Sequence, residues 1–148
     1  MVEVDPETGE TEIVDYAAVD DCGTRIHPQI VEGQVHGATV HAIGAALHEN
    51  FVYDEDGTLL TPNFYDYHVP HALDLPPLKT GAIESPSPFT PLGAKGMGEG
   101  GGGGIHCVGA AIQDALRSGG HDVFVYDSCN PSQRVWEMLH GASARVSR

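Results

Sequence analysis

The fold depends most on residues 28–49, which read Pro28-Gln-Ile-Val-Glu-Gly-Gln-Val-His-Gly-Ala-Thr-Val-His-Ala-Ile-Gly-Ala-Ala-Leu-His-Glu49. Apolar residues recur along this stretch at helical spacing, in two adjacent stripes, and this predicts the longest helix of the chain. Pro28 suits the first turn of that helix, where its missing N–H costs nothing. Because two apolar stripes cover much of the helix surface, we expect the helix to be buried on most sides.

Three glycines interrupt this predicted helix, at Gly33, Gly37 and Gly44. Each costs about 1 kcal/mol in a helix interior relative to alanine. A glycine allows another backbone or a ligand to approach closely, because it has no Cβ. We therefore expect such an approach along this helix.

Shorter elements surround the long helix. A polar turn at Pro6–Gly9 predicts a hairpin whose second strand runs through Ile13–Val19. Prolines recur from Pro62 to Pro91 and predict an ordered loop or an isolated strand there. Further predictions are a hairpin at 51–60, a strand at 123–125, and helices at 105–116 and 131–139. Together they predict one α+β domain over residues 1–148, in which hairpins and short strands pack with one long buried helix and two shorter helices, with residues 141–148 as a frayed tail.

The charge balance excludes nucleic acid as a partner, because the formal net charge is −14 and phosphate binding requires the opposite sign. A lysine-poor acidic surface suits a salt-rich cytoplasm, so a halophilic source is a hypothesis and an ordinary acidic protein its alternative. The three cysteines form no C-x-x-C pair. The N-terminal residues lack signal-peptide features, and no apolar stretch reaches the length of a membrane span. We expect a reducing, cytoplasmic environment.

The most unusual segment is Gly93-Ala-Lys-Gly-Met-Gly-Glu-Gly-Gly-Gly-Gly-Gly-Ile105. Exposed glycine amides and the start of the following helix can bind an anion. Glu99 stands alone among them, which is the arrangement of a base at a reaction centre. A flexible linker with an incidental glutamate is the alternative interpretation of the residues alone.

Three stretches in this order resemble one enzyme family. They are Val19-Asp-Asp-Cys-Gly-Thr-Arg-Ile-His-Pro28, Val31-Glu-Gly-Gln-Val-His-Gly-Ala38 and Pro91-Leu-Gly-Ala-Lys-Gly-Met-Gly-Glu-Gly-Gly101. They look like the C-terminal part of the large, molybdopterin-binding subunit of the xanthine dehydrogenase, aldehyde oxidase and aerobic carbon monoxide dehydrogenase family. The likeness covers most of the chain, and its Gly-x-Gly-Glu motif is the most specific part.

The resemblance implies roles for particular residues. Glu99 would be the catalytic base, which takes a proton from a hydroxyl ligand of molybdenum. Gly33 and Gln34 would contact the pterin, and backbone amides from Lys95 to Gly98, with Gly96 and Met97 between them, would line the cofactor. His41 departs from the family's usual glutamine, and we interpret it as a packed core histidine. We interpret His106 and Cys107, which also depart from the family pattern, as a substituted helix start.

The resemblance also implies that this chain is one part of a larger enzyme. The cofactor would be molybdenum-molybdopterin, with its cytosine dinucleotide form as one option. Other large-subunit segments would supply most substrate contacts, and iron–sulfur and FAD groups would lie on other domains or subunits. The substrate could be an aldehyde, a purine or other N-heterocycle, or carbon monoxide. The chain would then be a fragment or a separately encoded piece, inactive in isolation.

Two other functions remain open at this level. Gly96–Gly101 matches G-x-G-x-x-G and precedes a predicted helix and strand, so a dinucleotide-binding module with Asp127 near the ribose is one alternative. The preceding stretch is rich in proline, however, and predicts no central strand. The other alternative is a non-enzymatic metal-binding or assembly module, in which His36 pairs with His41 or His68 with His71.

Overall fold

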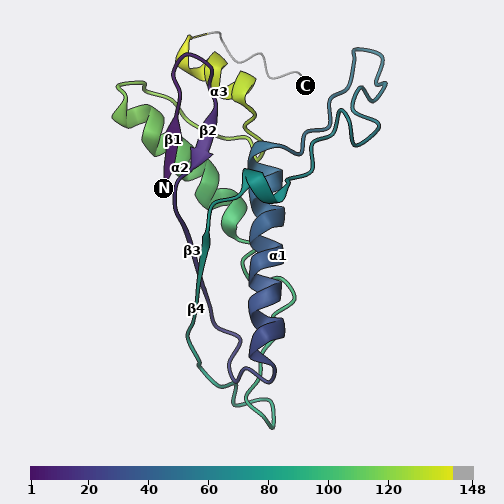
Figure 1. The fold of residues 1–148 in the computed structure, drawn as a ribbon, viewed down its shortest axis with the longest axis vertical. Helices are drawn as coiled ribbons and strands as arrows, with labels where there is room; N and C mark the ends of the chain where they lie inside the picture. Colours follow the sequence, from purple (N-terminus) through teal and green to yellow (C-terminus); the bar gives the residue numbers. More distant parts are fainter. Residues whose placement is uncertain (142–148) are drawn as a thin grey trace.

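The computed structural model describes residues 1–141, and helix α1 (Pro28–Leu47) runs along the longest axis of the molecule (Figure 1). Pro28 occupies the first turn, and the N–H of Ile30 donates to His27 Nδ1 at 3.3 Å. The side chain of His27 thus satisfies one of the N–H groups that a helix start leaves unpaired. The predicted long helix is confirmed, and it ends at Leu47.

The predicted N-terminal hairpin is also confirmed, with a shorter second strand. Strand β1 (Val2–Val4) pairs antiparallel with β2 (Thr11–Ile13). The prediction of a continuous strand through Ile13–Val19 is wrong, because Val14 and Asp15 belong to no strand: the N–H groups of both donate to the carbonyl of Met1, which interrupts the alternating strand pattern. A separate strand, β3 (Tyr16–Asp20), begins just afterwards.

A second small sheet consists of β3 and β4 (Leu78–Ala82), which are parallel. The prolines around 62–91 allowed an isolated strand, but β4 is hydrogen-bonded to β3 along its whole length. Parallel neighbours require a long crossover connection, and here that connection contains α1, which packs against both strands. The β3–α1–β4 unit fixes how the start of α1 lies relative to the loops beyond the two strands.

The remaining elements agree with the predictions in part. Helices α2 (Gly104–Ser118) and α3 (Ser132–Leu139) are confirmed, and a 3-10 helix, η1 (Ala72–Asp74), precedes β4. The hairpin at 51–60 is reduced to a single bridge between Tyr53 and Leu59.

The predicted strand at 123–125 is absent from this fully described segment. The backbone of residues 123–125 forms hydrogen bonds with side chains of α2 instead. The N–H of Val125 donates to Gln113 Oε1, and the Nε of Arg117 donates to the carbonyl of Val123, both at 3.1 Å. These two hydrogen bonds occupy the N–H of Val125 and the carbonyl of Val123, which a neighbouring strand would otherwise bind.

The core gathers around the C-terminal half of α1. Ile43, Ile112 and Val135 are fully buried there, where α1, α2 and α3 meet. The N-terminal half is largely bare, and Ile30 is 59% exposed, so the prediction of burial on most sides is wrong for this half. Of the three helix glycines, Gly44 has a close neighbour, since an added Cβ would lie 2.7 Å from Pro70 Cγ.

Mixed helices and small sheets confirm the α+β class. The predicted frayed tail, from residue 142 onward, lies outside the described residues. Among the described helices, none combines the length and apolar character needed to cross a membrane.

Candidate functional site

A groove of about 630 Å³ lies between the bare half of α1 and the glycine-rich segment 93–104. It brings Gly33 and Gln34, on α1, to the same surface as Gly98 and Glu99. The other lining residues are Gly37, Ala38, His41, Ala42, Gly102 and Gly103. The base and the amide contact that the sequence predicts therefore lie on opposite walls of one groove.

Gly101 holds the glycine segment against α1. Its N–H donates to Asp20 Oδ1 at 3.1 Å, and its φ of +82° lies in the left-handed region. A Cβ at this position would stand 2.8 Å from both Thr39 Oγ1 and the carbonyl oxygen of Val35. Only glycine satisfies both the backbone conformation and this close approach.

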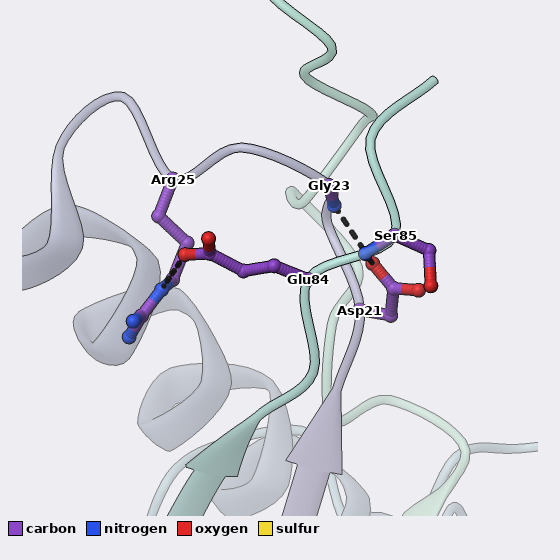
Figure 2. Close-up of polar contacts among 5 residues, drawn as sticks. All are labelled: Asp21, Gly23, Arg25, Glu84 and Ser85. Carbon is purple, nitrogen blue, oxygen red and sulfur yellow. Dashed lines mark hydrogen bonds and ion pairs between the residues drawn. The ribbon is translucent and has the colours of Figure 1, made fainter. Parts of the chain in front are cut away.

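The carboxylate of Asp21 joins the loop between β3 and α1 to the segment after β4 (Figure 2). Its Oδ1 accepts hydrogen bonds from the N–H groups of Gly23 at 2.8 Å and Ser85 at 3.1 Å. The ammonium of Lys95 lies 2.9 Å from the same oxygen. The ammonium, followed by the backbone donors, holds the pKa of Asp21 well below its usual range, so the carboxylate stays charged at neutral pH.

A second set of contacts joins the same loops. The Nε of Arg25 donates to Glu84 Oε1 at 2.8 Å (Figure 2). The N–H of Lys95 donates to the carbonyl of Cys22 at 2.7 Å, next to a bridge between residues 23 and 94. The β3–α1 loop, the segment after β4 and the start of the glycine segment are thus tied together.

The side chains of Glu99 and Gln34 are available to a ligand. Both residues are exposed, and within residues 1–141 neither side chain forms a hydrogen bond. The carbonyl of Glu99 accepts from the N–H of Gly102 at 3.0 Å, which closes a tight backbone turn that begins at Glu99. A free carboxylate can accept a proton, and a free amide can both donate and accept hydrogen bonds.

Several glycines of the groove leave the main chain open to close approach by a ligand. At Gly33, Gly37, Gly98 and Gly103, an added Cβ would meet no atom of this chain within 4 Å. These four glycines therefore leave space open and do not serve packing. Gly103 also precedes α2, whose first turn no side chain caps, so N–H groups beside the groove are left for an acceptor such as a phosphate.

Three predicted contacts lie outside the groove. Lys95 uses its backbone N–H on Cys22 and its ammonium on Asp21. The side chain of Met97 folds over Gly100, with its sulfur 2.9 Å from where a Cβ would stand. Gly96 precedes it and does not line the groove. Of the four residues from 95 to 98, the structure brings Gly98 alone into the groove.

The histidine and cysteine predictions have different outcomes. The interpretation of His41 as a packed core residue is wrong, because its side chain lies on the face of α1 that borders the groove and is exposed. His106 and Cys107 lie in the first turn of α2, as the helix-start interpretation expects. Cys107 Sγ lies 3.6 Å from Tyr16 Oη, and neither His106 nor Cys107 lines the groove.

Sequence reasoning expected a close approach at Gly37 without naming it as a site residue, and it missed Asp20. Gly37 follows Gly33 by one helical turn, so the i, i+4 spacing already placed both on one face and could have identified it. Asp20 has no such signal, because its bond to Gly101 joins residues far apart in the chain.

The dinucleotide-binding alternative lacks its structural context. Residues 83–103, all described, contain no strand before the G-x-G-x-x-G match, and none follows α2 at 123–125. Asp127 pairs instead with Arg134, at 2.7 Å. A nucleotide-binding unit requires a strand on each side of its glycine loop and helix, so this alternative is wrong.

Comparison with protein families matches residues 1–76 to a model described as the molybdopterin cofactor-binding domain. The carbon monoxide dehydrogenase large chain of Afipia carboxidovorans is 38% identical over 93% of this chain and 17% of its own length. The nicotine 6-hydroxylase large subunit of Paenarthrobacter nicotinovorans is 46% identical over 68% of this chain and 12% of its own length. The chain thus spans less than a fifth of these relatives.

Solved structures show the same similarity in three dimensions. Carbon monoxide dehydrogenase from Oligotropha carboxidovorans superposes with a TM-score of 0.87 at 35% identity, covering 98% of this chain and 18% of that chain. Quinoline 2-oxidoreductase from Pseudomonas putida 86 superposes with a TM-score of 0.83 at 38% identity, covering 94% of this chain and 18% of that chain.

Proposed function

The chain belongs to the family of molybdopterin cofactor-binding domains, and on that premise we propose that it supplies one wall of the cofactor site of a molybdenum hydroxylase. Glu99 is the catalytic base, and Gln34 contacts the pterin. The observation that carries this proposal is the groove itself, which joins these two residues from distant parts of the chain.

Bound molybdenum would supply a Lewis acid and an acceptor for electrons from the substrate. The chain's own residues have complementary roles. The Glu99 carboxylate accepts a proton at one of its oxygens, which an exposed and unpaired carboxylate can do. The Gln34 amide offers a donor and an acceptor to a polar heterocycle, and the bare glycines at 33, 37, 98 and 103 let the ring system approach the backbone.

The substrate and the partners also belong to this proposal. Two relatives are named carbon monoxide dehydrogenase and nicotine 6-hydroxylase, so we propose that this segment serves several substrates and that other segments set the substrate class. We propose that other large-subunit segments complete the site and that iron–sulfur and FAD subunits take the electrons. The bare half of α1 and the loop before it, where Ile30 and Ile26 are about 60% exposed, give such segments a surface.

Two finer points follow from the same premise. The uncapped first turn of α2 receives a phosphate of the cofactor, which takes its cytosine dinucleotide form. The three cysteines within the described residues are free thiols, which suits assembly in the cytoplasm.

The test replaces Glu99 by Gln in the assembled enzyme. We expect turnover to fall by about 10²–10⁴-fold, the scale for a positioned base. Cofactor content should stay at the wild-type level, as measured by molybdenum and by the CMP that acid releases from the cytosine dinucleotide form. The glutamine keeps the size and hydrogen bonding of the side chain but cannot accept the proton.

Glu32→Gln is the matched control. Glu32 is an exposed acid on α1 that lies outside the groove, so its variant should turn over at the wild-type rate. A loss below about tenfold for Glu99→Gln would reject Glu99 as the base. Loss of molybdenum together with activity would assign Glu99 to cofactor binding instead.

A further inference from the structure

Three imidazoles and a carboxylate gather at the C-terminal end of α1, away from the groove. His48 follows the last residue of the helix, His71 precedes η1, and Asp74 is the last residue of η1. His68 Nε2 lies 3.0 Å from Asp74 Oδ2, and His71 Nδ1 lies 3.4 Å from the same oxygen. The rings of His48 and His68 are 4.9 Å apart between centroids.

The spacing of these groups suits one metal ion. Ligand atoms of His48, His68 and Asp74 all lie within 4.8 Å of one another. Tetrahedral zinc, bound at about 2.0–2.2 Å, holds its ligand atoms roughly 3.3–3.5 Å apart. His68 Nε2 and Asp74 Oδ2, 3.0 Å apart, would separate by a few tenths of an ångström, and ligand atoms up to 4.8 Å apart would draw together by side-chain rotation.

The fold fixes the backbone that carries these ligands. Pro70 lies against Gly44, where a Cβ would be 2.7 Å from its Cγ. Tyr67 Oη donates to Glu49 Oε2 at 2.7 Å. The 67–71 segment is therefore held against the last turn of α1 on both sides of His68, which lowers the entropy that metal binding would otherwise cost.

The backbone also orients the carboxylate of the cluster. The N–H of His71 donates to Asp74 Oδ2 at 2.7 Å, so this oxygen is held facing the imidazoles of His68 and His71. A carboxylate oxygen fixed beside imidazole nitrogens is a common donor arrangement in zinc sites.

We propose that His48, His68 and Asp74 form a zinc site that joins the end of α1 to the segment before β4. Imidazole nitrogen and carboxylate oxygen are zinc donors. His71 faces the same carboxylate oxygen, and its side chain is 74% exposed. The fourth coordination position of the zinc ion is therefore filled by His71 or by water. Gly44 leaves room for Pro70 beside the last turns of α1, and the same loop places His68 next to His48.

The test is calorimetric titration of the full chain with zinc chloride at neutral pH, followed by zinc-edge X-ray absorption. We expect one zinc per chain with nitrogen and oxygen neighbours alone. His68→Ala and Asp74→Asn should each weaken binding by about 10–100-fold or more, since each removes one of three protein ligands. His121→Ala, at a histidine remote from the cluster, should bind as the wild type does.

Several outcomes would overturn the proposal. Absence of stoichiometric zinc in the wild type would do so, as would equal affinity in His68→Ala and wild type. Sulfur in the absorption spectrum would point to Cys129, which is near Glu49, and away from Asp74. Circular dichroism checks that His68→Ala is folded, and the zinc readout is independent of molybdenum and of turnover.

Discussion

Glycine has two physical roles in the segment 93–104. At Gly101 a positive φ and the adjacent backbone of α1 require it for packing. At Gly98 and Gly103 an added Cβ would meet nothing within this chain, and both residues face the groove. The first role builds the wall of the site, and the second leaves room beside it.

The charged carboxylate of Asp21 contacts two backbone N–H groups and the ammonium of Lys95. Its pKa is lowered in the folded chain, chiefly by Lys95, so its contribution to stability is complete above the ordinary pKa of 3.8 and is lost as the pH falls below that value toward the folded pKa. Asp21→Asn should therefore lower the free energy of unfolding near neutral pH, by an amount that shrinks as the pH falls below the ordinary value. Urea denaturation as a function of pH measures this difference.

Asp114→Asn is the control for that experiment. Asp114 is an exposed acid on α2, without a hydrogen-bond partner among the described residues. Its variant should follow the wild type at every pH. A difference between Asp21→Asn and wild type that stayed constant into strong acid would show that the contribution of Asp21 is independent of its charge.

At the scale of elements, α1 consists of two halves with different tasks. The C-terminal half buries Ile43 and Leu47 in the core, while the N-terminal half presents Gln34 and bare glycines to the groove. Val35 and Thr39, buried at the junction, meet Gly101. The contact between α1 and the glycine segment therefore sets the width of the groove.

Substitution of Gly101 by Ala should disrupt that contact. The added Cβ would collide with α1, and the backbone would be strained at its positive φ. We expect a loss of about 1–3 kcal/mol in the free energy of unfolding, measured by thermal or urea denaturation. Gly96→Ala, where the Cβ meets nothing within 4 Å, should change stability by less than about 0.5 kcal/mol. Equal effects at both positions would contradict this account of Gly101.

At the scale of the whole molecule, the net charge of −14 produces self-repulsion that salt screens. Glu3 and Glu12 illustrate it, because they are direct cross-strand partners in β1 and β2, where like charges destabilise a sheet.

We expect the melting temperature to rise as KCl increases to molar concentrations. Glu12→Lys should raise stability at low salt by about 0.2–1 kcal/mol and reduce the salt dependence, because it makes an attractive pair with Glu3. A melting temperature independent of KCl would count against the halophilic hypothesis.

The sequence by itself determined the elements whose signals are local. The periodicity and Pro28 identified α1, and the helical spacing after residue 104 identified α2. The order of three motifs identified the family, because these motifs depend on residues close together in the chain. Glu99 and Gln34 were named as site residues on the same ground.

Only the tertiary structure decided which faces were covered and which distant segments met. The pairing of β4 with β3, the bare half of α1 and the exposure of His41 depend on contacts between residues far apart in sequence. The loss of the strand at 123–125 depends on side chains of α2 in the same way. Periodicity reports which residues could be buried, but the free energy of burial is realised only where another element is present to cover them.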